Sequence, residues 1–168
     1  MDVPYDSAEN GIYVADAPHV CSRLIGAACD AGVKFLQMTL LEDVVVHDGR
    51  LTGVVVNWSA VGLSSLHVDP LTIRSSYVID ATGHAAEVVR MLEGRVPMGP
   101  EIKKEAPLWA EKGEEAVVEN TREVYPGLLV AGMAANAVFG APRMGPVFGG
   151  MLLSGKKAAQ LVCEGLKG

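Results

Sequence analysis

The chain has 168 residues, of which 49% are hydrophobic and 20% charged, a balance that is ordinary for one soluble globular domain. Its formal net charge of −6 excludes the basic surface typical of nucleic-acid-binding proteins. No segment approaches the roughly 18 apolar residues of a membrane span, and the acidic N-terminus lacks the apolar core of a signal peptide. We therefore expect a cytoplasmic protein with a single domain over residues 1–168 and neither nucleic acid nor membrane as a partner.

The first part of the chain predicts a helix followed by a hairpin. Apolar residues recur at helical spacing after Pro18, and the pattern ends at Gly32. The pair Asp48-Gly49 lies between two β-branched runs and is typical of a two-residue hairpin turn. The expected elements are a strand at 11–16, a helix at 17–32, and strands at 33–46 and 51–58.

The later part of the chain predicts strands that alternate with helices. Residues 59–83 favour two strands, and Pro70 requires the first to lie at a sheet edge or to end nearby, because proline has no N–H to donate. The other expected elements are a short helix at 85–94, an irregular charged surface segment at 95–120, a buried strand running into a loop at 127–140, and a helix at 146–166. This order indicates an α/β fold with a mixed sheet and a β-hairpin layer.

Two histidines and an aspartate form the first candidate site. His67 and Asp69 are two residues apart on an expected strand, so their side chains would share one face. His84 follows a buried strand at its carboxyl end, where open α/β sheets bind ligands. Imidazole and carboxylate groups are the ligand types of non-haem Fe(II) sites. The spacing alone favours the plainer alternative of a structural His–Asp hydrogen bond and a capping histidine.

The second candidate site is the segment GAPRMGPVFGGM, residues 140–151. Gly145 permits a close approach of the backbone to a ligand, and the following helix would present free N–H groups. With Arg143 beside it, this helix start is suited to a carboxylate or a phosphate. The alternative is an exposed arginine beside glycines that pack a helix against a strand.

Met133 disfavours a flavin site, and the spacing of the cysteines disfavours a CxxC site. Flavin-binding proteins of similar folds typically have an aspartate at the place of Met133, and a methionine cannot hold the ribityl chain of FAD in its stead. An FAD-dependent oxidoreductase fragment is therefore a disfavoured alternative. Cys21, Cys29 and Cys163 have no CxxC spacing, and we expect them to be small buried hydrophobic residues in a reducing compartment.

Several segments together resemble the thiamine thiazole synthases, in particular their archaeal and bacterial form. They are GVVVNWSAVG at 53–62, LHVDPLTIR with VIDATGH at 66–84, and the long run from VENTREVYPG through GAPRMGPVFGGM to SGKKAA at 118–159. The resemblance implies a glutathione-reductase-type dinucleotide-binding fold and a ring-like homo-oligomer, usually an octamer. It also implies a transferase that forms an adenylated thiazole carboxylate for thiamine from NAD, glycine and sulfur, with Fe(II) as the metal.

The resemblance further implies roles for individual residues. Asp69 and His84 match the iron ligands, with the aspartate reaching across from a neighbouring protomer, and Arg143 matches the residue that holds the glycine carboxylate. His67 stands where eukaryotic members carry a sulfur-donating cysteine, so free sulfide is the expected sulfur source. His67 itself would be a third metal ligand or a proton carrier. The residues expected along the bound NAD are Leu41, His67, Val68, Asp69 and Met133.

The chain departs from this family at its beginning. Family members begin with a βαβ unit containing GxGxxG, which holds the pyrophosphate at a helix N-terminus, and this sequence has no such unit. We expect the chain to be the C-terminal part of a synthase, an incomplete dinucleotide-binding fold that binds NAD weakly or not at all by itself. Ribulose-1,5-bisphosphate formation and a non-catalytic remnant domain are two further alternatives.

Overall fold

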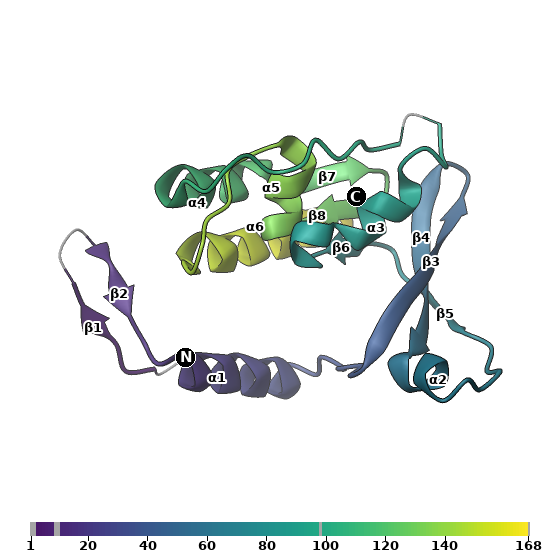
Figure 1. Cartoon of the computed structure of the whole chain (residues 1–168), viewed down its shortest axis with the longest axis horizontal. Coiled ribbons are helices and arrows are strands. Elements are labelled where there is room, and N and C mark those ends of the chain that lie inside the picture. The colour runs from purple at the N-terminus through teal and green to yellow at the C-terminus, as the bar shows by residue number, and fades with distance from the viewer. Residues whose placement is uncertain (1–2, 9–10, 98, 168) are drawn as a thin grey trace. The chain divides into compact units, whose positions relative to one another are not determined.

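The computed structural model describes residues 3–8, 11–97 and 99–167. The chain divides into two compact units, residues 1–37 and residues 38–168. Figure 1 traces both from the N-terminus to the C-terminus. Strands and helices alternate along the chain, and one sheet is mixed, so the predicted α/β class is confirmed.

The first unit consists of a short strand pair and one helix. β1 (Asp6–Ser7) pairs antiparallel with β2 (Tyr13–Val14). α1 (Ala17–Asp30) begins at Asp16, whose carboxylate accepts the backbone N–H of His19 at 2.9 Å. An aspartate at this position satisfies an N–H group that has no partner inside the helix. The predicted strand and helix of this unit are confirmed.

An antiparallel sheet opens the second unit. Its strands are β3 (Thr39–His47), β4 (Arg50–Trp58) and β5 (Leu71–Arg74), in the order β3-β4-β5. Asp48 and Gly49 join the first two strands with φ of +49° and +73°, as a type I′ turn requires. The predicted hairpin is confirmed, although β3 begins later than the sequence pattern indicates.

The connection from β4 to β5 corrects the sequence prediction. It forms α2 (Ser59–Leu63) and then an irregular loop, residues 64–70. His67 and Asp69 lie in this loop, so the prediction that they share one face of a strand is wrong. Pro70 gives the physical reason, since it cannot donate to a ladder, and β5 begins directly after it at the edge of the sheet.

A second sheet forms the centre of the unit. β8 (Leu128–Val130) lies in the middle, parallel to β6 (Val78–Asp80) and antiparallel to β7 (Arg122–Tyr125). All residues of β8 are buried, as expected for a central strand covered on both faces. This sheet is the mixed sheet that the sequence predicts.

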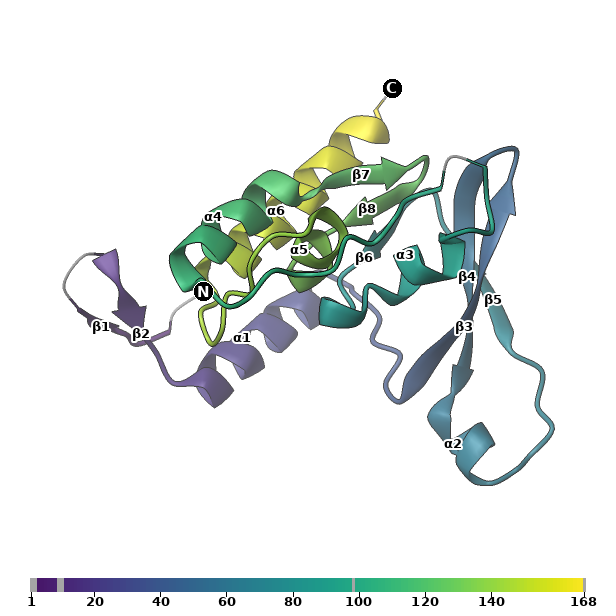
Figure 2. The same ribbon diagram turned by 45° about the horizontal axis from the view of Figure 1, so that its top comes forward.

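Helices pack around the second sheet, and in both views α4 and α6 run side by side (Figures 1 and 2). Gly150 permits this close approach, because a Cβ at that position would lie 2.6 Å from the carbonyl oxygen of Glu114 on α4. The helices are α3 (Glu87–Leu92), α4 (Ala110–Asn120), α5 (Met133–Phe139) and α6 (Gly149–Gly165). The predictions of α3 and α6 are confirmed.

Two predictions fail in this half of the chain. The sequence predicts an irregular segment over residues 95–120, but α4 forms at the end of this segment. The helix is mostly charged and buries only Gly113 and Val117, so its sequence shows little apolar periodicity. The segment after β8 was expected to be a loop, but α5 forms there. Residues 133–138 are all buried, and a helix buried on every side shows no apolar period in its sequence.

The main core joins the two sheets. Side chains from β4, α3, β8 and α5 meet there without exposure to solvent, and they include Leu51, Val89, Leu92, Leu128, Val130 and Ala134. Burial of such side chains is worth roughly 1.5–3 kcal/mol each before the entropy of ordering is subtracted. The candidate site lies beside this core, on the turn after β6, the segment before α4 and the loop after α5.

The cysteine prediction is wrong, because Cys21, Cys29 and Cys163 are all exposed. Two of them lie on α1, which buries none of its residues, and the third lies on an exposed position of α6. In the described part of the chain, no helix has the length and apolar character needed to cross a bilayer.

Candidate functional site

A buried aspartate holds the turn that carries His84. Asp80 ends β6 and has no exposed surface; one of its oxygens accepts the N–H and the hydroxyl of Thr82 at 3.0 and 2.7 Å. Its other oxygen accepts the N–H of Val89 at 3.0 Å. The Thr82 hydroxyl accepts the N–H of Glu87 at 2.7 Å. These bonds fix both ends of the turn, and with it the position of His84.

His84 points from this turn toward a carboxylate. Its ring Nδ1 pairs with Oε1 of Glu105, a residue 21 positions further along the chain. The histidine side chain is 55% exposed, whereas the glutamate side chain is only 5% exposed. A buried carboxylate therefore contacts an imidazole that is more than half exposed.

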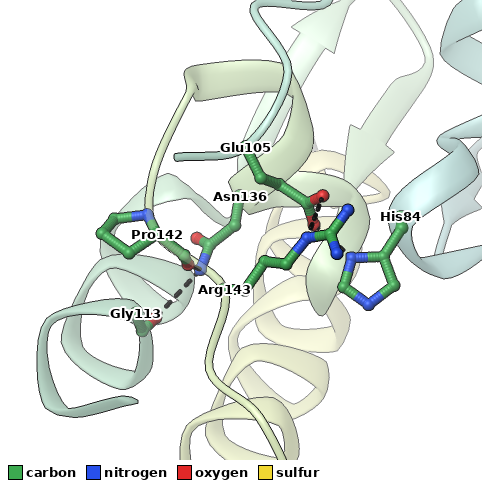
Figure 3. Close-up of polar contacts among 6 residues, drawn as sticks. All are labelled: His84, Glu105, Gly113, Asn136, Pro142 and Arg143. Atoms are coloured by element: carbon green, nitrogen blue, oxygen red, sulfur yellow. Dashed lines mark hydrogen bonds and ion pairs between the residues drawn. The ribbon is translucent and has the colours of Figure 1, made fainter. Parts of the chain in front are cut away.

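The same carboxylate contacts Arg143. The guanidinium Nε donates to Oε2 of Glu105 at 3.3 Å, and the arginine side chain is 57% exposed. Figure 3 shows the Glu105 carboxylate, the Arg143 guanidinium and the His84 ring gathered close together. Two predicted site residues thus meet on a glutamate that the sequence reasoning did not select.

The backbone holds Glu105 and Arg143 next to each other. The segment before α4 runs beside the segment after α5, and Ala106 and Pro142 form a parallel β-bridge. The hydrogen bonds between the segments run from Lys103 N to Val138 O at 3.2 Å, Ala106 N to Ala141 O at 3.1 Å, Arg143 N to Ala106 O at 3.3 Å, and Trp109 N to Arg143 O at 3.0 Å. This ladder brings together two residues that are 38 positions apart.

A buried asparagine supports the segment that carries Arg143. Asn136 on α5 donates from Nδ2 to the carbonyl oxygens of Gly113 at 3.0 Å and Pro142 at 3.1 Å. Its Oδ1 accepts the side-chain amide of Asn120 at 3.3 Å. Figure 3 shows Asn136 reaching between the two carbonyl groups. The loop beyond α5 is therefore tied to α4 directly in front of Arg143.

One N–H at the helix start after Arg143 is already bonded within the chain. The backbone N–H of Gly150 in α6 donates to Oε1 of Glu114 at 2.9 Å. A carboxylate of the chain itself therefore already faces the positive end of the helix dipole. The Gly150 N–H is therefore not open to a ligand, and the guanidinium of Arg143 pairs with Glu105 through its Nε. An anion at the rest of this helix start stays a prediction.

The loop that contains the other predicted ligands is built differently. His67, Val68 and Asp69 are all exposed. The loop is tied to β4 by the side-chain amide of Asn57, which is 6% exposed and donates to the carbonyl oxygen of Val68 at 3.3 Å. In both views the loop between α2 and β5 lies away from α3 and α5 (Figures 1 and 2).

The described residues contain no group of three or more histidine, cysteine, aspartate or glutamate side chains that would hold a metal. Within one copy of the chain, the structure does not bring Asp69 to His84. The implied metal site with an aspartate from a second copy therefore stays a prediction.

The predicted nucleotide-contacting residues Leu41 and Met133 are used for packing. Leu41 on β3 is half-buried and packs against the main core. Met133 is 8% exposed and packs with Val117 and Met144. Gly132 before it has φ +59° and ψ −146°, a conformation that is essentially restricted to glycine. Because both side chains are engaged in packing, a ligand would reach these positions through the backbone.

Comparison with known proteins agrees with the sequence motifs. The model of the Thi4 family matches residues 1–148. The thiamine thiazole synthase of Pyrococcus abyssi is 54% identical over 166 residues, which are 99% of this chain and 66% of the relative. That of Methanothermobacter thermautotrophicus is 52% identical over 171 residues, covering 98% of this chain and 64% of the relative.

A solved structure matches as well. The crystal structure of Thermovibrio ammonificans THI4 superposes with a TM-score of 0.92 at 45% sequence identity, covering 99% of this chain and 66% of that one. This chain thus spans about two thirds of the length of the relatives that it matches. The matching family model, the identities and the shared fold confirm the resemblance: the chain belongs to the Thi4 family.

Proposed function

We propose that this chain carries the metal-binding and glycine-binding residues of a sulfide-using thiamine thiazole synthase. The reaction forms an adenylated thiazole carboxylate from NAD, glycine and sulfide, and requires Fe(II). One observation supports the proposal above others: the implied metal ligand His84 and the implied glycine-binding Arg143 contact the same carboxylate, Glu105. Two chemically different roles thus meet within one small cluster.

His84 has the surroundings of a metal ligand. Metal-binding histidines commonly donate their second ring N–H to a carboxylate, which fixes the tautomer and the orientation of the ring. Glu105 occupies this place at Nδ1, so Nε2 is the nitrogen left to bind a metal. An imidazole together with the Asp69 carboxylate fits Fe(II) and leaves coordination positions open. When bound, the metal would act as a template and Lewis acid for the condensation.

Arg143 has the free donors that a small amino acid needs. Its Nε is engaged by Glu105, and its two terminal nitrogens have no hydrogen-bond partner among the residues that the structure describes. These two nitrogens match the two oxygens of a carboxylate. We assign to Arg143 the binding and orientation of the glycine carboxylate beside His84.

His67 is assigned to proton transfer or to a third ligand position. It lies in an exposed loop two residues before Asp69, and an imidazole can accept and donate a proton near neutral pH. No cysteine is present in this loop, and the three cysteines of the chain lie on α1 and α6. Dissolved sulfide is therefore the sulfur source in the proposed reaction.

The proposal includes NAD contacts and a second copy of the chain. We assign the backbone at Leu41, Val68 and Met133 to the nucleotide, on a dinucleotide-binding fold of the glutathione-reductase type. The half-buried side chain of Leu41 and the buried side chain of Met133 both pack within the chain, which agrees with contacts made by the backbone. Because Asp69 lies apart from His84 within one copy, the aspartate of the metal site would come from a neighbouring copy in a homo-oligomer.

An anaerobic assay with glycine, sulfide, Fe(II) and a large excess of NAD, which offsets the weak NAD binding expected of this chain, tests the proposal. We expect mass spectrometry to detect the adenylated thiazole carboxylate and free nicotinamide, and both to disappear when glycine, sulfide or Fe(II) is omitted. His84→Ala and Arg143→Ala should greatly reduce the amount of product at fixed substrate concentrations, whereas Glu101→Gln, an exposed change nearby, should not. A folded protein that binds Fe(II) and NAD but forms no thiazole would contradict the proposed function.

A further inference from the structure

Glu105 is buried although the two side chains that it contacts are exposed. Its side chain is 5% exposed, compared with 55% for His84 and 57% for Arg143. A buried carboxylate must be paired, because it loses its hydration. Here each of its oxygens has its own partner: Oε1 contacts the imidazole and Oε2 contacts the guanidinium. Both oxygens of the carboxylate are therefore engaged within the chain.

The backbone around Glu105 fixes its position. Lys104, directly before it, has a φ of +63°, which is uncommon for a residue with a Cβ. Ala106, directly after it, pairs with the strand-like segment at Pro142. Unusual backbone conformations persist where the surrounding structure determines them, and they are often found at functional sites. The backbone on both sides of Glu105 therefore fixes the position of its carboxylate.

The contacts also decide which atoms of the partners stay free. An imidazole that is held at Nδ1 presents Nε2, and a guanidinium that is held at Nε presents its two terminal nitrogens. These are the atoms that a metal and a glycine carboxylate need. A single carboxylate thus sets the orientation of two binding groups that come from the turn after β6 and the loop after α5.

We propose that Glu105 is a positioning residue that joins the metal site to the glycine site. It holds the His84 ring with Nε2 toward the metal, and it holds Arg143 with its terminal nitrogens toward the amino acid. This inference deepens the proposed function and rests on it. Loss of Glu105 should therefore weaken both metal binding and glycine binding. Loss of His84 should weaken mainly metal binding, and loss of Arg143 mainly glycine binding.

The test compares three variants and one control variant in two measurements. Co(II), a spectroscopic substitute for Fe(II), is titrated to give a metal Kd, and the anaerobic assay gives the KM for glycine. For Glu105→Gln we expect a metal Kd raised about 10- to 100-fold, as is usual when the carboxylate behind a metal-bound histidine is lost, together with a raised glycine KM. His84→Ala should raise mainly the metal Kd, and Arg143→Ala mainly the glycine KM. Glu101→Gln should change neither.

Thermal unfolding distinguishes positioning from general stability. Glu105→Gln keeps the size of the side chain and one acceptor oxygen, so its Tm should stay close to that of the unaltered protein. Glu105→Asp restores the charge on a shorter side chain and should recover part of one binding function. A Glu105→Gln protein with unchanged metal Kd and unchanged glycine KM would overturn the inference.

Failure of the two proposals is distinguishable. If the unaltered protein forms thiazole and Glu105→Gln behaves in the same way, the positioning role falls and the proposed function stands. If the unaltered protein forms no thiazole but Glu105→Gln weakens Co(II) binding as His84→Ala does, the proposed function falls and the role toward the histidine stands.

Discussion

The two halves of the proposed metal site are built in opposite ways. His84 lies on a turn fixed by the buried Asp80, and its ring is held by Glu105, which a backbone ladder holds in turn. His67 and Asp69 lie in an exposed loop that Asn57 ties to β4 through one backbone carbonyl. The first half is therefore organised within a single chain. In the second half, the exposed side chains of His67 and Asp69 can contact a group that comes from outside the chain.

This difference indicates how the site is assembled. A binding group that is held in place before binding loses little entropy when the ligand arrives. An exposed loop loses more, and it becomes ordered where a ligand or another chain covers it. We infer that the turn and loop around Glu105 form the fixed half of the site and that the loop at 64–70 completes it from a second copy.

Asp80→Ala should have the largest effect on the fixed half. It removes a buried carboxylate that accepts bonds from Thr82 and Val89, and it leaves their N–H groups without a partner. We expect a loss of about 3 kcal/mol in the free energy of unfolding, measured by urea denaturation. Asp69→Ala in the exposed loop is the matched control and should change stability by less than about 0.5 kcal/mol. Equal losses in the free energy of unfolding for the two variants would contradict the view that one half is fixed and the other exposed.

Asn136→Ala should give the next largest effect. The change removes the bonds to the carbonyl oxygens of Gly113 and Pro142, and so releases the segment that carries Arg143. We expect a loss of about 2 kcal/mol in stability and a raised glycine KM, since the guanidinium is less well placed. The metal Kd should change less, because His84 lies on a different segment. A glycine KM that stays unchanged in a destabilised Asn136→Ala protein would contradict the supporting role.

Asn57→Ala tests the exposed half with a smaller expected effect. The side chain of Asn57 donates to Val68 and accepts the N–H of Trp58 at 2.9 Å. We expect a loss of about 1 kcal/mol in stability. Hydrogen exchange in the loop at 64–70 should become faster, while exchange in the turn at His84 stays the same. Faster exchange at both places would indicate that the two halves are not independent.

The ion pair between Asp43 and Arg95 should give the smallest effect. The hydrogen bond from the Arg95 guanidinium, at 2.9 Å, lowers the pKa of Asp43 below its ordinary value near 3.8, with help from the N–H of Val44. Because the folded pKa is the lower one, the pair stabilises the protein above about pH 4, and this contribution is lost as the pH falls through the folded pKa.

Both side chains of this pair are 44% exposed or more, so the contribution should stay below about 1 kcal/mol. Arg95→Gln should lower stability at pH 7 by that small amount and leave stability near pH 2 unchanged. Urea denaturation at the two pH values measures it. A loss of the same size at both pH values would show that Asp43 is not the partner responsible.

Sequence reasoning predicted the elements that depend on neighbouring residues. The turn at Asp48-Gly49 and the start of α1 at Asp16 follow from local rules, and both are confirmed. α5 was missed because a helix that is buried on all sides has no apolar period. Residues 64–70 form a loop although their pattern predicts a strand, because His67 and Asp69 alternate with apolar residues as they would in a strand.

The candidate site was predictable only in part, because sequence patterns report on neighbouring residues and not on contacts between distant segments. His84 and Arg143 were selected from the strand end and the glycine-rich segment around them. Glu105 has no local signal: it lies in a charged segment that looks like ordinary surface, and its burial comes from pairing with Arg143 far along the chain. Such a residue becomes visible only when the backbone ladder between the two segments is known.

The most direct measurement is Co(II) binding by co-expressed Asp69→Ala and His84→Ala chains. Each variant alone lacks one of the two proposed ligands at every site. We predict that neither binds Co(II) with the affinity of the unaltered protein, and that mixed assemblies recover a fraction of normal sites, where an intact Asp69 meets an intact His84 from another copy. Mixed assemblies that bind no better than the separate variants, or single variants that bind normally, would contradict a metal site shared between copies.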